Sequence, residues 1–183
     1  HEDDEEEDVN SIVPFQIAYA VSIHKAQGLE YDHVKIIIID EVDELIAALT
    51  TMKLYIPVMH CEKRIGEVIS KGEFCEAYRR FDINCHIARA IGAESIVVHL
   101  WNGITSDAHF QNNIDAYSRL KDIADKYDVK VLIENIVCNH EDPMKRWCEL
   151  KEQFPDICFV FDTKMASFHS QMELLYEEEY EWL

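Results

Sequence analysis

The sequence predicts an α/β fold built from parallel βαβ units, and three observations support this class. Short apolar runs alternate with longer segments in which apolar residues recur at helical spacing. Successive runs in the second half lie about 30 residues apart, which leaves room for a crossover helix between parallel strands. Polar residues stand near the ends of four of these runs, where parallel sheets place their functional groups. These residues are His60, His99, Glu134 and Asp162.

The predicted strands are short and rich in aliphatic or aromatic residues. The run of four isoleucines within residues 34–39 suits a strand that is buried on both faces, as in a parallel sheet. The later runs end beside histidine or acidic residues. We expect strands at residues 15–21, 34–39, 54–59, 95–100, 129–133 and 157–161.

Apolar residues three or four positions apart predict the helices that separate these strands. Gly92 is placed to end one helix. Asp142 followed by Pro143 is a typical helix start, because the carboxylate accepts backbone N–H groups and proline suits the first turn. Ser106 or Asp107 is placed to cap the helix between these two. We expect helices at residues 41–52, 73–91, 110–127, 142–154 and 168–175.

Composition narrows the classes of function. The chain has 183 residues, with 36 Asp and Glu against 17 Lys and Arg, for a net charge of -19. This sign disfavours nucleic acid and anionic membranes as partners. Residues 1–12 begin with a block of acidic residues, so we expect a disordered tail there. No signal peptide, long apolar span or Cys-x-x-Cys pair occurs, and a cytoplasmic location is expected.

Three segments carry a family resemblance: Ser-Ile-Val-Val-His-Leu-Trp at 95–101, Val-Leu-Ile-Glu-Asn at 131–135 and Phe-Val-Phe-Asp-Thr-Lys-Met-Ala at 159–166. With them, residues 45–183 resemble the sugar-phosphate isomerase/epimerase family, which has a xylose-isomerase-like TIM barrel. Their order matches barrel strands three to six. The resemblance implies that a divalent metal is bound by residues at four strand ends: His60, His99, Glu134 and Asp162.

The resemblance also implies the chemistry. Carboxylates with imidazoles suit Mn²⁺, Mg²⁺, Co²⁺ or Zn²⁺. Such a metal polarises a sugar carbonyl and stabilises an enediolate while a protein group moves a proton between adjacent carbons. Glu134 and His99 are the expected catalytic residues, and the substrate is expected to be a sugar or sugar phosphate. Trp101, Asn135 and His169 are the expected substrate-binding residues.

The chain departs from the family pattern in several places. The family also uses a histidine and a glutamate from strands seven and eight, and the chain ends before them. Strands one and two are not recognisable upstream. Met165 stands where many relatives have a histidine, and His169 lies one helical turn later as an alternative. Four strands cannot close an eight-stranded barrel, so we expect an incomplete domain whose open sheet edges favour self-association.

A second resemblance lies at residues 13–40. The segment Ser-Ile-His-Lys-Ala-Gln-Gly at 22–28 follows the first predicted strand. It is similar to a motif in the C-terminal RecA-like domain of superfamily 1 DNA/RNA helicases. No Gly-x-x-x-x-Gly-Lys-Ser/Thr phosphate loop is present, so ATP hydrolysis is not expected. The resemblance implies that the residues facing nucleic acid or nucleotide are Ser22, His24, Lys25, Gln27 and Gly28.

The sequence therefore predicts a composite chain: a tail at 1–12, a helicase-like fragment at 13–40 and a partial barrel at 41–183. The preferred function is an incomplete divalent-metal-dependent sugar isomerase or epimerase domain. The alternative is a non-catalytic helicase fragment that acts as an interaction module. Two structural alternatives stay open for the site. Glu134 and Asp162 are also placed to cap the helices that follow them, and His99 is also consistent with a core histidine.

Overall fold

A computed structural model describes residues 42–182, and the chain divides into two compact units, 1–51 and 52–183. The described part of the first unit is one helix, α2 (Val42–Thr51). The acidic tail, the strands expected at 15–21 and 34–39 and the helicase-like motif lie outside the described residues. The second unit contains, in order, β1 (Val58–His60), α3 (Arg64–Ser70), α4 (Phe74–Ala90), β2 (Ser95–Val98), α5 (Phe110–Lys126), β3 (Lys130–Glu134), α6 (Pro143–Gln153), β4 (Cys158–Val160), α7 (Thr163–Phe168), η1 (Met172–Tyr176) and η2 (Glu178–Tyr180).

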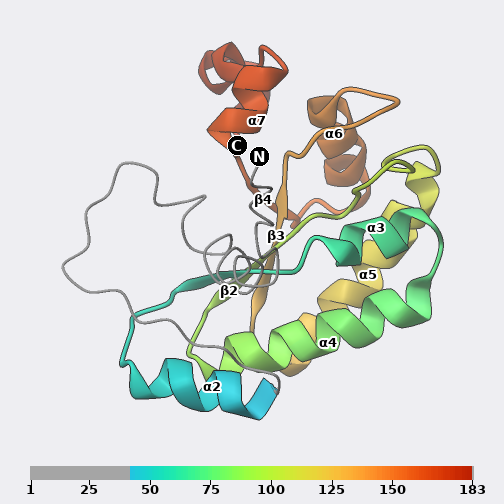
Figure 1. Ribbon diagram of the computed structural model, residues 1–183. Helices are drawn as coiled ribbons and strands as arrows, with labels where there is room; N and C mark the ends of the chain where they lie inside the picture. The colour runs from blue at the N-terminus through green and yellow to red at the C-terminus, as the bar shows by residue number, and fades with distance from the viewer. Residues whose placement is uncertain (1–41, 183) are drawn as a thin grey trace, which may run out of the picture. The chain divides into compact units, whose positions relative to one another are not determined.

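The four strands of the second unit form one parallel sheet in the order β1-β2-β3-β4 (Figure 1). The register pairs His60 with Val97 and Glu134 with Val160. Each strand therefore lies beside the one before it in the chain, and helices form the crossovers. This arrangement confirms the predicted parallel α/β class and brings the carboxyl ends of all four strands to one edge. It is consistent with part of a TIM barrel.

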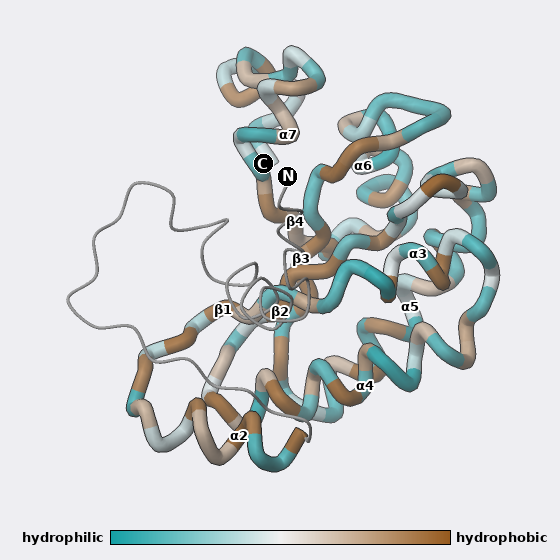
Figure 2. Tube along the Cα trace, viewed as in Figure 1, coloured by the Kyte–Doolittle hydropathy of each residue, from teal (hydrophilic) through white to brown (hydrophobic). Residues whose placement is uncertain are grey.

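The core lies between the sheet and the helices that cover it. In Figure 2, apolar colour follows β3, whereas α4 alternates between apolar and polar residues. The largest fully buried side chains include two tryptophans, Trp101 and Trp147. None of the helices in the described part of the chain is long and apolar enough to cross a membrane. Cys61, Cys75, Cys85, Cys138 and Cys158 are free thiols.

Most predicted elements are present, with shifted ends. β1 begins later than expected, because Pro57 precedes it and proline cannot donate to the ladder. The helix predicted at 168–175 is not continuous: α7 ends at Phe168, and the short 3-10 helix η1 begins at Met172. Ser170 adopts a left-handed φ of 58° there, and the Gln171 N–H donates back to the Ala166 carbonyl. The sequence did not predict α3.

The structure confirms two of the predicted helix ends, at Asp142 and Gly92. Asp142 caps α6 as predicted, since its carboxylate accepts hydrogen bonds from the backbone N–H groups of Met144 and Lys145. Gly92 follows α4 with a φ of 81°, which confirms it as the stop.

The cap predicted for α5 is wrong. The residue at that position is His109, which makes no side-chain cap bond. The Asp107 carboxylate instead accepts N–H groups from residues 139–140 and pairs with Arg146 at 3.0 Å. The hydroxyl of Ser106 lies 3.4 Å from the carbonyl of Val137. Both residues therefore join the loop after β2 to the loop after β3.

Candidate metal centre

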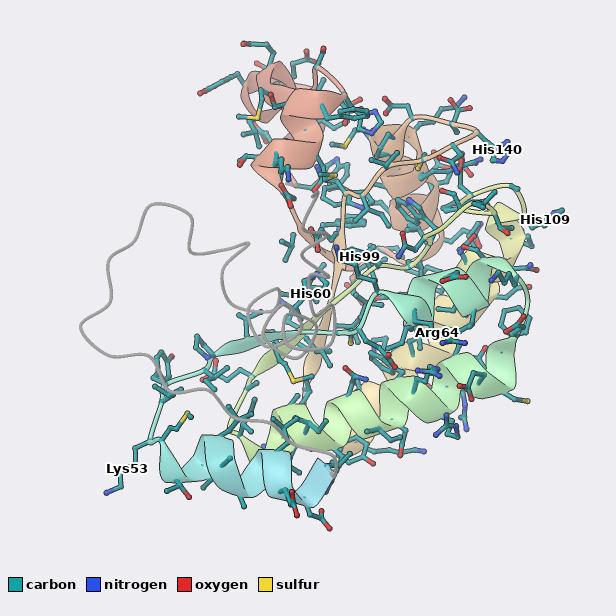
Figure 3. The ribbon with its side chains drawn as sticks, in the orientation of Figure 1. Lys53, His60, Arg64, His99, His109 and His140 are labelled. Carbon is teal, nitrogen blue, oxygen red and sulfur yellow. The ribbon has the colours of Figure 1, made fainter. Side chains whose placement is uncertain are left out.

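Three of the predicted site residues meet at the carboxyl edge of the sheet. His60 is the last residue of β1, His99 directly follows β2, and Glu134 ends β3. Figure 3 shows the two histidines side by side. One ligand atom from each of the three residues lies within 4.8 Å of the other two. Among residues 42–182, no other group of three His, Cys, Asp or Glu side chains has this spacing.

Both imidazoles point at the same carboxylate oxygen. The Nε2 atom of His60 lies 2.7 Å from Oε2 of Glu134, and Nε2 of His99 lies 3.1 Å from it. The two rings are nearly perpendicular, with centroids 4.8 Å apart. The side chains of His99 and Glu134 are 9% and 11% exposed, whereas that of His60 is 24% exposed. Among the described residues, His60 is therefore the most accessible member of the cluster.

The hydrogen bonds of His60 fit a bound cation. Its Nδ1 atom lies 2.6 Å from the carbonyl oxygen of Cys61, while its Nε2 faces Glu134. Both partners are acceptors, but a neutral imidazole has only one N–H to donate. The arrangement therefore needs either a doubly protonated ring or a cation at Nε2. In the second case Nδ1–H donates to the Cys61 carbonyl and fixes the tautomer, as is usual for metal-binding histidines.

The electrostatics of Glu134 also suit a ligand. Burial alone would raise the pKa of this carboxyl. Hydrogen bonds from His60 and His99, and the charges of these rings, have the opposite effect and hold the pKa well below its ordinary value. Glu134 is therefore ionised at neutral pH, as a metal ligand must be. The Nδ1 atom of His99 is buried and has no hydrogen-bond partner among the described residues.

Asp162 and Asn135 make structural contacts at the end of β4. The Asp162 carboxylate caps α7, accepting the backbone N–H groups of Lys164 at 2.7 Å and Met165 at 3.2 Å. The Asn135 amide bonds to both backbone groups of Asp162: its Oδ1 accepts the N–H at 2.5 Å and its Nδ2 donates to the carbonyl at 3.1 Å. Asp162 is not part of the three-residue cluster, and the side chain of Asn135 is fully buried.

Trp101 and His169, the other two expected substrate-binding residues, also lie outside the cluster. Trp101 is fully buried, and its ring packs edge-on against Phe110 with centroids 5.7 Å apart. His169 follows the last turn of α7, where its ring contacts Phe168. Its Nε2 atom is buried and has no hydrogen-bond partner in the described part of the chain.

The segment after β2 is held by residues that the sequence did not single out. Ser70 at the end of α3 and Asn113 of α5 both bond to it from the side of the helices. Gly66 in the middle of α3 lies against its backbone. The available signal for α3 was the spacing of three apolar residues, Ile65, Val68 and Ile69, on one face of a helical turn.

The described residues form an α/β unit in which two histidines and a glutamate meet at the carboxyl edge of a parallel sheet. The chain belongs to the xylose isomerase-like TIM barrel family, whose model matches residues 20–180. No curated protein sequence matches it.

Solved structures that are similar to the chain include the following two proteins. A sugar phosphate isomerase/epimerase from Parabacteroides distasonis ATCC 8503 is 16% identical, with a TM-score of 0.54, over 83% of this chain and 58% of that protein. A xylose isomerase domain protein from Planctomyces limnophilus is 13% identical, with a TM-score of 0.48, over 66% of this chain and 48% of that protein. The chain thus spans about half the length of these relatives. At such identities, the likeness to the Parabacteroides protein shows the fold alone.

The helicase resemblance at 13–40 has no support in these comparisons. Its motif residues, Ser22, His24, Lys25, Gln27 and Gly28, lie outside the described residues. The family match begins at residue 20 and so includes them.

Proposed function

We propose that this chain is the metal-binding part of a sugar or sugar phosphate isomerase or epimerase, and that His60, His99 and Glu134 hold the metal. The observation that carries this proposal is the convergence of two imidazole nitrogens and one carboxylate oxygen at the carboxyl edge of the sheet. Membership of the xylose isomerase-like family supports the reaction class. The Parabacteroides neighbour, which is a sugar phosphate isomerase/epimerase by name, supports the substrate class.

The ligand types favour some metals over others. Two nitrogen ligands and one oxygen ligand suit Zn²⁺, Co²⁺ or Mn²⁺, whereas Mg²⁺ prefers oxygen ligands and keeps much of its water. Three protein ligands leave further coordination positions for substrate, as in catalytic sites. We therefore place Mg²⁺ last among the four metals that the family resemblance implies.

When bound, a divalent metal supplies a Lewis acid that polarises a substrate carbonyl. The protein side chains hold the metal and contact the substrate. His60 is the most exposed of the three side chains, and so it faces the incoming sugar. Oε2 of Glu134 faces both imidazoles, while its Oε1 accepts no hydrogen bond from the described residues. Oε1 is therefore the oxygen of Glu134 that remains available to face the substrate, and His99 is the other expected catalytic residue.

Several expectations stay predictions. A complete active site requires the rest of a barrel, because the chain spans about half of its structural neighbours. Within the described sheet, β1 and β4 each have one neighbouring strand, and Val58 of β1 is 46% exposed. Self-association through these edges is consistent with this geometry. The cytoplasmic location is also a prediction.

Metal titration followed by thermal unfolding tests the proposal. We expect Zn²⁺, Co²⁺ or Mn²⁺ to raise the melting temperature in a concentration-dependent way, because a ligand that binds only the folded state stabilises it. Glu134→Ala should remove this response. Glu152→Ala, which changes an exposed glutamate of α6, should keep it. A wild-type protein whose melting temperature responds to none of these metals would overturn the proposed site.

The reaction class needs a second assay. Because a complete active site requires the rest of a barrel, the metal-loaded chain is extended by the strands that would complete one and incubated in D₂O with ketoses and their phosphates. NMR follows deuterium at the carbon next to the carbonyl. We expect exchange that depends on metal and on Glu134. A protein that binds metal tightly but exchanges no proton on any of these sugars would leave a metal site without the proposed chemistry.

A further inference from the structure

We propose that Gly66 is a positioning residue for the metal centre: because it has no side chain, α3 can lie against the backbone that follows His99, and this contact sets the separation of the two imidazoles. The inference rests on the proposed metal site. It concerns a residue that touches neither metal nor substrate.

The contact at Gly66 is too close for any side chain. A Cβ atom built on this residue would lie 2.4 Å from the carbonyl oxygen of His99 and 2.8 Å from that of Trp101. Carbon and oxygen atoms that are not bonded do not approach so closely. Both neighbours are backbone atoms, so they cannot turn aside as a flexible side chain would. A larger residue must therefore displace either α3 or the segment that carries His99.

The segment after β2 has little freedom to retreat. The hydroxyl of Ser70, at the end of α3, lies 3.4 Å from the N–H of Asn102, and the side chain of Asn102 donates to the carbonyl of Lys63. From α5, the amide of Asn113 donates to the carbonyl of Leu100 at 2.8 Å. Moving this segment away would leave buried polar groups without partners, which costs free energy.

Displacing α3 also acts on the other histidine. Only residues 61–63 separate His60 from the first residue of α3. The first of them, Cys61, is fixed to the sheet, since its N–H donates to the carbonyl of Val97 at 2.9 Å. Its carbonyl accepts the Nδ1–H of His60 and so orients that ring. α3 is therefore linked to both histidines through the backbone. It follows His60 closely in the chain, and its Gly66 packs against the backbone carbonyl of His99.

Metal sites respond strongly to such shifts, because ligands must stay close to their productive geometry. Changes in groups that orient ligands typically weaken metal binding about 10- to 100-fold. We therefore expect a methyl group at residue 66 to weaken binding by about tenfold or more. The absorption spectrum of bound Co²⁺ should change as well, since it reports the ligand geometry.

The test compares Gly66→Ala with Ile69→Ala in the folded proteins, checked by circular dichroism. Ile69 is a fully buried residue of the same helix, so its truncation costs stability but adds no atom that would push α3 away from the backbone of His99. Co²⁺ titration gives the affinity and the visible spectrum of each variant. Gly66→Ala should bind about tenfold more weakly with an altered spectrum. Ile69→Ala should keep the wild-type spectrum and an affinity within about twofold of wild type.

If Gly66→Ala does not fold, Ser70→Ala provides the test. This variant removes the hydroxyl that bonds the segment after β2 and adds no bulk, and it should also weaken Co²⁺ binding and alter the spectrum. The proposal is overturned if every folded variant of Gly66 and Ser70 binds Co²⁺ with the affinity and spectrum of Ile69→Ala. If the wild-type protein itself binds no Co²⁺, the metal site fails and this inference fails with it.

Discussion

Glu134 is the last residue of β3 and Asp162 lies two residues beyond the end of β4, and these two carboxylates have different partners. Glu134 faces two imidazoles from the neighbouring strands, whereas Asp162 faces the N–H groups of the helix that comes directly after it. The chain after Glu134 continues as an irregular loop, but Asp162 leads at once into α7. The first N–H groups of a helix need acceptors, and a preceding aspartate supplies one. In these two cases the segment after the strand differs: Asp162 caps the helix that follows it through Oδ1, whereas Glu134 caps none and faces the imidazoles.

The largest effect should come from removing the charge of Glu134. Glu134→Gln keeps the shape of the side chain but replaces an anionic ligand by a neutral amide. We expect its affinity for Zn²⁺ or Co²⁺, measured by isothermal titration calorimetry, to fall about 100-fold. Asp162→Asn should stay within about twofold of wild type. Equal losses in the two variants would contradict the distinction between the two strand ends.

Substitution of Asn135 tests whether the hydrogen bonds around Asp162 stabilise the fold. Asn135→Leu keeps a similar volume but leaves the backbone N–H and carbonyl of Asp162 without their partner. We expect the free energy of unfolding, from urea titration, to fall by about 1–3 kcal/mol. Asn84→Leu should cost less, because the amide of Asn84 makes one bond within α4. A direct substrate contact by Asn135 would instead show as lost activity without this loss of stability.

The two helix caps provide a matched pair with a smaller effect. Asp162→Ala and Asp142→Ala each remove a carboxylate that accepts two backbone N–H groups, at α7 and α6 respectively, and Asp142 also accepts the side-chain amide of Gln171. Asp162→Ala should lower the free energy of unfolding by about 1 kcal/mol and Asp142→Ala by more, and both should leave metal affinity unchanged. If Asp162→Ala weakened metal binding while Asp142→Ala did not, Asp162 would belong with the ligands.

The pH dependence of the metal-free protein tests the state of the Glu134 carboxylate without a metal. The pKa of Glu134 is lowered on folding, so its contribution to stability is complete above the ordinary value of about 4.3. This contribution is lost as the pH falls from there towards the folded-state pKa. Urea unfolding at a series of pH values should therefore show a steeper acid loss in wild type than in Glu134→Gln. Parallel curves would mean that the imidazoles do not hold the carboxylate in its charged form.

The sequence predicted the sheet and much of the cluster for a physical reason. Apolar runs with crossover spacing fix the order of parallel strands, and the carboxyl ends then share an edge. That geometry brings His60, His99 and Glu134 together. The pattern could not show that Asp162 points its carboxylate at α7, because an aspartate before a helix is both a cap and a strand-end residue.

Contacts between distant segments explain the features that the sequence did not predict. α3 has only seven residues, and its glycine is explained by the backbone of His99, which lies 33 positions later. Trp101 stands beside a candidate ligand in the sequence, yet its ring points into the core against Phe110. Neither contact can be deduced from the local pattern.

X-ray absorption at the metal edge of the Zn²⁺-loaded protein tests the central claim most directly. The spectrum reports the first ligand shell, with zinc–nitrogen distances of about 2.0–2.1 Å for histidine. We predict two imidazole ligands together with carboxylate oxygen in wild type, and a changed shell in Glu134→Gln. A wild-type spectrum with only oxygen ligands, or with fewer than two imidazoles, would contradict a site built from His60, His99 and Glu134.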